Sequence, residues 1–181
     1  MNAFNQSLIF LLLASSNVFA ARDPDLLAGD VAQILAPSAG LALTYYFDDS
    51  DGRKEWMKST AATIVATEAL KYSFNSTYLG KRPNGGSRGF PSGHSSAACS
   101  GAFFLADRYG WQYGAPGLVV AAITGYSRVD EGFHHWRDVI AGCALSYGIS
   151  RYFVDAIPPK VTISPEIGSH SFGATVSYHF Q

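Results

Sequence analysis

Pro91-Ser92-Gly93-His94 and, further along, Ser127-Arg128-x5-His134-x3-Asp138 are the two stretches that decide how this 181-residue chain folds and where its chemistry lies. Ser92 is a natural N-cap, so the first stretch predicts a helix that begins there and runs to about Tyr109. Free backbone N–H groups and the helix dipole favour an anion at such a start. Gly93 lets the backbone approach that anion closely, and the Ser92 hydroxyl adds a donor. The first stretch therefore predicts an anion site.

The second stretch predicts a reactive histidine. If the following helix begins at residue 134 or 135, His134 and Asp138 stand at i and i+4 on one helical face. The carboxylate can then accept a hydrogen bond from one ring nitrogen, which fixes the tautomer and leaves the other nitrogen free to attack. Arg128 offers a fork of donors that suits phosphate oxygens.

His94 and Arg82 complete the predicted site. His94, at the mouth of the anion site, can protonate a leaving oxygen as a general acid. Arg82, which precedes Pro83, provides a second guanidinium. Taken singly, a His-x3-Asp pair or a Ser-Gly-His run is usually structural. Together and in this order they predict a phosphate site, and one that requires no metal or cofactor.

These motifs resemble the signature of the type 2 phosphatidic acid phosphatase (PAP2) superfamily, which shares a helical fold with vanadium-dependent haloperoxidases. That signature is Lys-x6-Arg-Pro, Pro-Ser-Gly-His and Ser-Arg-x5-His-x3-Asp, and its second and third parts stand here unchanged. The resemblance implies that His134 is the nucleophile that forms a phosphohistidine, Asp138 its orienting partner, and His94 the general acid that later activates water. It also implies a set of phosphate ligands: Arg82, Arg128, Ser92 and the Gly93 amide.

The lysine of the signature's first part is displaced. Counting back from Arg82, its strict position holds Asn75, and Lys71 lies four residues too early. Either Lys71 serves, with an extra turn in the connector, or Lys81 substitutes from the connector. The helical setting and the Leu-Lys-Tyr context favour Lys71 as a phosphate ligand.

The expected fold is all-α, a compact bundle of about five to six helices with a short β-like C-terminal tail. The expected helices are 25–47 with a kink or break at Pro37, 56–74, 92–109, 116–128, and a last one from 134 or 135 to about 154. Residues 48–52 read as a solvated acidic turn. Alternation over residues 172–180 predicts a strand, for which residues 161–163 supply the hairpin partner, docked on the helices.

Cys99 and Cys143 lie in apolar helical stretches, where a free cysteine behaves as a small hydrophobe. An oxidising compartment would allow them to pair. The sequence favours two free cysteines and leaves their pairing open.

Residues 1–20 contain no charged side chain and hold an apolar run followed by small residues, the pattern of a signal peptide. This predicts cleavage after Ala20 or Ala21, an exported, periplasmic protein, and a single phosphatase domain over residues 21–181, with residues 159–181 as its tail. The net charge of −1 argues against nucleic-acid binding. The helical stretches are short or interrupted by charges, so no spanning helix is expected, and peripheral membrane contact stays open.

The expected function is metal-independent hydrolysis of phosphate esters through a phosphohistidine. Lipid phosphates are favoured as substrates, because the aromatic-rich helices could contact an acyl or prenyl tail. The alternatives are a periplasmic acid phosphatase for soluble phosphomonoesters and a vanadate-dependent haloperoxidase. A non-enzymatic envelope component is a further alternative, against which His94, His134 and Asp138 argue. The sequence predicts no oligomeric state.

Overall fold

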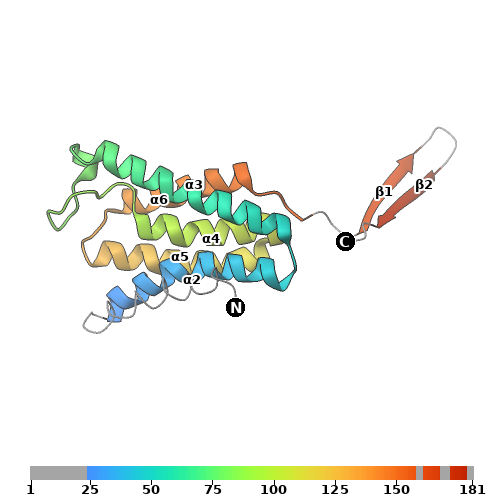
Figure 1. Ribbon diagram of the computed structural model, residues 1–181, viewed down its shortest axis with the longest axis horizontal. Helices are drawn as coiled ribbons and strands as arrows, with labels where there is room; N and C mark the ends of the chain where they lie inside the picture. The colour runs from blue at the N-terminus through green and yellow to red at the C-terminus, as the bar shows by residue number, and fades with distance from the viewer. Residues whose placement is uncertain (1–23, 158–160, 168–171, 179–181) are drawn as a thin grey trace, which may run out of the picture.

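The computed structural model describes residues 24–157, 161–167 and 172–178. Within them lie five α-helices, a short 3₁₀ turn and one hairpin: α2 (Pro24–Tyr46), α3 (Ser50–Phe74), η2 (Tyr78–Gly80), α4 (Gly93–Tyr109), α5 (Trp111–Asp130), α6 (Trp136–Phe153), β1 (Val161–Ile167) and β2 (Phe172–Tyr178). The helices run along a common long axis (Figure 1). The predicted all-α bundle with a β-like tail is therefore confirmed. The predicted signal peptide lies outside the described residues.

Helix α4 is the centre of the bundle and packs against α2, α3, α5 and α6. Its small residues allow this, since Ala98 and Ala102 are completely buried. A Cβ at Gly101 would collide with the backbone of α2 at Ala36 and Pro37, and one at Gly114 of α5 would collide with Ala106 of α4. Close packing around α4 thus requires glycine on both sides of the contact.

The helices differ from the sequence prediction at three points. Helix α2 continues through Pro37, so the expected break is absent. The Pro37 carbonyl accepts a hydrogen bond from the Trp56 indole of α3 at 2.9 Å. Helix α3 begins at Ser50, because the Asp49 side chain caps it by accepting from the backbone N–H of Gly52. Helix α5 begins at Trp111 and contains Pro116 in its interior. The prolines mislead because each removes only one intrahelical hydrogen bond, which the surrounding packing outweighs.

A buried ionic cluster closes the end of the bundle away from the two signature stretches. The Arg108 guanidinium donates to both carboxylate oxygens of Asp49, at 2.7 and 2.6 Å, and Tyr109 donates to Asp49 at 2.9 Å. Glu55 also lies 3.2 Å from Arg108. Burial acts to raise the pKa of Asp49, but the hydrogen bonds from Arg108, Gly52 and Tyr109 outweigh it and hold that pKa below its usual value. The predicted solvated acidic turn is thus a partly buried junction.

Cys99 of α4 and Cys143 of α6 form a disulfide, with their Cα atoms 5.2 Å apart. Of the two alternatives that the sequence left open, the favoured free form is therefore wrong. Apolar surroundings predict burial and not pairing: Cys99 is buried and Cys143 partly buried, and the packing of α6 against α4 brings them together.

The tail forms the predicted antiparallel hairpin, in which Val161 pairs with Tyr178 and Ile167 with Phe172. The first strand is longer than expected and includes Pro165. The hairpin stands clear of the helices (Figure 1), so it is not docked on them as predicted.

Candidate active site

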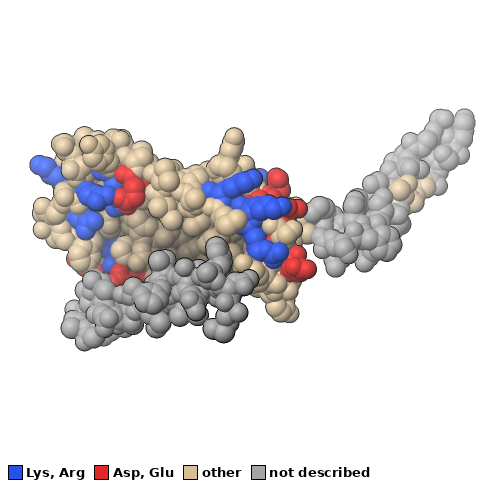
Figure 2. Space-filling model, in the orientation of Figure 1, with Lys and Arg blue, Asp and Glu red and all other residues tan. Residues whose placement is uncertain are grey.

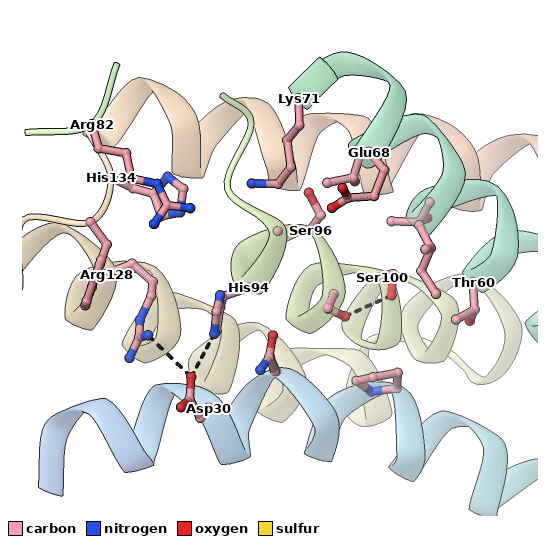
Figure 3. Close-up of a pocket in the computed structure, with 18 residues that line it drawn as sticks. Asp30, Thr60, Glu68, Lys71, Arg82, His94, Ser96, Ser100, Arg128 and His134 are labelled. Atoms are coloured by element: carbon pink, nitrogen blue, oxygen red, sulfur yellow. Dashed lines mark hydrogen bonds and ion pairs between the residues drawn. The ribbon is translucent and has the colours of Figure 1, made fainter. Parts of the chain in front are cut away.

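A cavity of about 670 Å³ lies between α2, α3 and α4, and both signature stretches reach it. At one end it is lined by basic side chains and histidines from five separate segments: Lys71 of α3, Arg82 of the connector, His94 of α4, Arg128 of α5 and His134 of the loop before α6. Figure 3 shows these side chains converging. Three cationic side chains and two histidines around one cavity are suited to binding an anion.

Lys71, not Lys81, belongs to the cavity lining. Its side chain is buried, and its Nζ donates to the Arg88 carbonyl at 3.1 Å. Burial lowers the pKa of Lys71, the nearby Arg82 charge acts in the same direction, and Glu68 opposes both. The turn η2 occupies the connector, so the chain between Lys71 and Arg82 has the extra turn that this alternative needs.

Arg82 also points into the cavity. Its Nε is buried and finds no hydrogen-bond partner among the residues that the structure describes. Burying an unpaired guanidinium donor costs free energy, and a bound anion would remove that cost.

His134 precedes α6 and does not belong to it, because His135 is the N-cap of that helix. The predicted i and i+4 placement on one helical face is therefore wrong. The Nδ1 of His134 lies 2.7 Å from the Gly89 carbonyl and 3.7 Å from the Asp138 carboxylate. A carbonyl only accepts, so Nδ1 carries the proton and Nε2 is left bare.

The protonation state of His134 follows from its surroundings. Burial lowers the pKa of His134 to about 3, and the charges of Lys71 and Arg82 act in the same direction. The ring is therefore neutral at ordinary pH. A neutral imidazole with a bare Nε2 is the nucleophilic form.

Asp138 is completely buried beside His134. Its Oδ2 accepts from the backbone N–H of His135 at 2.8 Å, and its Oδ1 lies 3.4 Å from Arg137. The backbone carbonyl of Asp138 accepts from the N–H of Ser92 at 2.9 Å. Asp138 thus fixes the start of α6 next to the start of α4 and acts on His134 at longer range than expected.

Ser92 caps α4 as predicted, and its side chain accepts from the Ser95 backbone N–H. The Ser92 side chain is completely buried and lies outside the cavity lining, whereas Gly93 belongs to the lining. The start of α4 therefore presents the Gly93 backbone to the cavity, with the Ser92 hydroxyl behind it.

Asp30 of α2 is a site residue that the motifs do not contain. Its Oδ1 lies 2.8 Å from His94 Nε2 and 3.4 Å from the Arg128 guanidinium (Figure 3). Burial lowers the pKa of His94, the hydrogen bond to Asp30 opposes that shift, and the Arg128 charge reinforces it. The signal that could have identified Asp30 is a carboxylate in the interior of a mainly apolar helix.

Neither a metal site nor a membrane span is evident in the part of the chain that the structure describes. No three His, Cys, Asp or Glu side chains there are grouped to hold a metal ion. Across the same residues, no helix has the length and apolar character required to cross a membrane.

The sequence is similar to members of one protein family. The sequence model of the PAP2 superfamily matches residues 47–161. A lipid A 4'-phosphatase of Helicobacter pylori (strain J99) is 32% identical over 166 residues, covering 84% of this chain and 83% of that protein. Lipid phosphate phosphatase 2 of Arabidopsis thaliana is 34% identical over 89 residues, covering 41% of this chain and 31% of that protein.

Two solved structures share the fold. Aquifex aeolicus LpxE superposes with a TM-score of 0.54 at 22% identity, covering 78% of this chain and 92% of its own. A transmembrane PAP2-type phosphatidylglycerolphosphate phosphatase from Bacillus subtilis gives a TM-score of 0.53 at 21% identity, covering 84% and 87%.

Proposed function

The chain belongs to the PAP2 superfamily and is a phosphoric monoester hydrolase, and on that premise we propose that it hydrolyses lipid phosphates through a phosphohistidine intermediate on His134. The bare, neutral Nε2 of His134 at the cationic end of the cavity carries this proposal.

In the first step, Lys71, Arg82 and Arg128 hold the phosphate oxygens, together with the Gly93 amide. The Nε2 of His134 attacks phosphorus, an N–P bond forms, and the bond from phosphorus to the alcohol oxygen breaks. His94 donates a proton to that leaving oxygen. Asp30 holds the other ring nitrogen of His94 and stabilises its protonated form.

In the second step, the neutral His94 accepts a proton from water while the water oxygen attacks phosphorus. The N–P bond breaks, inorganic phosphate is released, and His134 returns to its neutral form. The three cations neutralise the charge that builds on the phosphate oxygens in both steps, so the residues present supply the electrostatic stabilisation that the reaction needs.

The lipid substrate class is supported by the surface as well as by the names of the two relatives. Large apolar side chains are exposed on four helices: Leu35 of α2, Val65 of α3, Val119 of α5 and Ile140 of α6. On the face shown in Figure 2, charged residues gather near the two ends of the bundle and leave the surface between them largely uncharged. Such a surface suits contact with lipid.

We further propose that residues 1–20 are a signal peptide and that residues 21–181 act as one exported phosphatase domain. Export would place the enzyme in the periplasm, where a lipid headgroup is reached from the aqueous side. The sequence pattern of residues 1–20 supports this placement.

The test is His134→Ala, with His135→Asn as the neighbouring control, because asparagine keeps an N-cap side chain for α6. Rates on p-nitrophenyl phosphate and on phosphatidate in mixed micelles are measured with EDTA present. We expect His134→Ala to abolish phosphate release and trapping of acid-labile phosphoenzyme, and His135→Asn to retain both. Unchanged phosphate release by His134→Ala would refute the mechanism. Loss of wild-type activity in EDTA would refute metal independence.

A further inference from the structure

Two neighbouring backbone carbonyls hold the lysine and the nucleophilic histidine of the site. The Arg88 carbonyl accepts from Lys71 Nζ at 3.1 Å, and the Gly89 carbonyl lies 2.7 Å from His134 Nδ1. Arg88 and Gly89 belong to the connector between η2 and α4, outside both signature stretches. The orientation of this Arg88–Gly89 segment therefore influences two side chains of the site at once.

The Arg88–Gly89 segment is itself anchored at three points. The Arg88 N–H donates to Asn75 Oδ1 at 3.2 Å, and the Gly89 N–H donates to the Gly80 carbonyl of η2 at 2.8 Å. The Arg88 guanidinium pairs with Glu68 of α3, which lies on the cavity wall (Figure 3). Asn75 is the C-cap of α3 and stands at the strict position of the signature lysine. The end of α3 thus supplies two of the three anchors.

Arg88 has a left-handed backbone, with a φ of 58°. This region is disfavoured for residues with a side chain, most of all for β-branched ones, and glycine enters it at no steric cost. The connector uses glycine at positions 85, 86 and 89, yet position 88 holds an arginine. The contact that arginine adds there is the ion pair with Glu68.

We propose that Arg88 is a positioning residue, whose left-handed backbone aims the two neighbouring carbonyls at Lys71 and His134. This inference rests on the proposed phosphatase function and adds a residue that acts through the nucleophile. The Gly89 carbonyl keeps the proton of the neutral His134 ring on Nδ1, which leaves Nε2 bare for attack. The Arg88 carbonyl holds the Lys71 ammonium in the cavity lining.

Two substitutions separate the backbone conformation from the side-chain charge. Valine disfavours the left-handed region, whereas asparagine tolerates it. Both variants lose the guanidinium, so the loss of its exposed ion pair is common to them. With p-nitrophenyl phosphate, we expect Arg88→Val to lower kcat about tenfold, since a β-branched residue there carries the strain of a local backbone outlier. Arg88→Asn should stay within about threefold of wild type, because an exposed ion pair contributes little.

The tautomer of His134 gives a second readout, which does not depend on activity. Nitrogen NMR at neutral pH, on protein with isotope-labelled histidines, distinguishes Nδ1–H from Nε2–H rings. The His134 signal is assigned by its absence from the His134→Ala spectrum. We expect Nδ1–H in the wild type and in Arg88→Asn, and a share of Nε2–H in Arg88→Val, because the ring loses its closest acceptor.

Asp48→Val is the matched control for backbone strain. Asp48 also has a left-handed backbone, with a φ of 51°, and lies exposed between α2 and α3, outside the cavity lining. Valine there introduces comparable strain at a distance from the site. We expect this variant to lower the free energy of unfolding in urea as Arg88→Val does, but to keep kcat within about threefold and to leave the His134 signal unchanged.

Asn75→Leu tests the same segment from its other side, should Arg88→Val fail to fold. The substitution removes the acceptor of the Arg88 N–H at an exposed position outside the cavity lining. We expect kcat to fall about fivefold, the effect of one ordinary hydrogen bond, and part of the His134 signal to change to Nε2–H.

Two outcomes would overturn the inference alone. One is an equal loss of kcat in Arg88→Val and Arg88→Asn, and the other is a His134 ring that keeps its Nδ1 proton in both Arg88→Val and Asn75→Leu. If instead the wild-type enzyme releases no phosphate, the proposed function falls, and the NMR comparison still decides whether the Arg88–Gly89 segment holds His134.

Discussion

Replacing Lys71 by methionine should lower kcat/KM for an aryl phosphate by about 10²–10³, or about 3–4 kcal/mol of transition-state stabilisation. The side chain is 7% exposed, and the Arg88 carbonyl holds its Nζ at 3.1 Å. This fixed ammonium lies in the cavity beside Arg82 and His134. Its loss removes a fixed, charged donor from the lining of the cavity.

The same substitution should move the pH profile in a defined direction. The Lys71 charge is one cause of the lowering of the pKa of His134 to about 3, after burial itself. Without that charge the pKa of His134 rises. Because only neutral His134 attacks, the acid limb of kcat/KM should move to higher pH.

Although Lys71→Met should lower activity, it should not lower the stability of the fold. Burial lowers the pKa of Lys71, which means that the folded protein disfavours its charged form. At neutral pH, methionine removes that unfavourable burial and fills the same space. The free energy of unfolding should therefore be unchanged or larger.

The assay is hydrolysis of p-nitrophenyl phosphate from pH 3 to 9 with EDTA, alongside urea unfolding. Lys81→Met is the matched control, because Lys81 is exposed and lies outside the cavity lining. It should keep kcat/KM within about threefold, far less than the loss of a bound-anion donor. The reasoning is refuted if Lys71→Met keeps more than a third of the activity, or if Lys81→Met loses as much.

Three other perturbations have expected outcomes. Asp30→Asn should move the alkaline limb of kcat/KM to lower pH, because the carboxylate supports protonated His94; a profile that does not move would remove Asp30 from the mechanism. Replacing Cys99 and Cys143, which are 44 residues apart, with alanine should lower the free energy of unfolding in urea by about 4 kcal/mol, the chain-entropy value for a loop of that length; a change below about 1 kcal/mol would contradict it. Asp49→Ala should cost about 3 kcal/mol in the same assay, the lower end of the range for removing one partner of a buried ion pair, because the Arg108 guanidinium loses its bidentate carboxylate and keeps only Glu55. Since the pKa of Asp49 is lowered by folding, its contribution should be present above pH 4 and disappear as the pH falls through its folded pKa, and a cost that persists below that pH would count against the ionic explanation.

Local sequence signals were sufficient to locate the helices and to name most of the basic residues and histidines that line the cavity. Ser92 caps α4 because its side chain satisfies backbone donors that any helix start exposes. The basic residues and histidines of the motifs do meet at one cavity. The predicted helix boundaries at Pro37 and Pro116 were wrong, because packing against α4 outweighs the local preference of proline for a helix end.

Other features depend on contacts between segments far apart in the chain. Asp30 and His94 are 64 residues apart, and no pattern in either segment predicts that they pair. The tautomer of His134 is fixed by a backbone carbonyl at Gly89, 45 residues away, and not by the carboxylate four residues on. The disulfide likewise requires α6 to lie on α4.

By itself, the sequence determined the reaction class, because a phosphate site needs particular side chains in a particular order and those are visible as letters. Only the tertiary structure decided which lysine lines the cavity, which groups hold the two histidines, and which other side chains surround them. The physical reason is that burial, pKa and hydrogen-bond partners are set by neighbours in space. Most of those neighbours here come from a different helix.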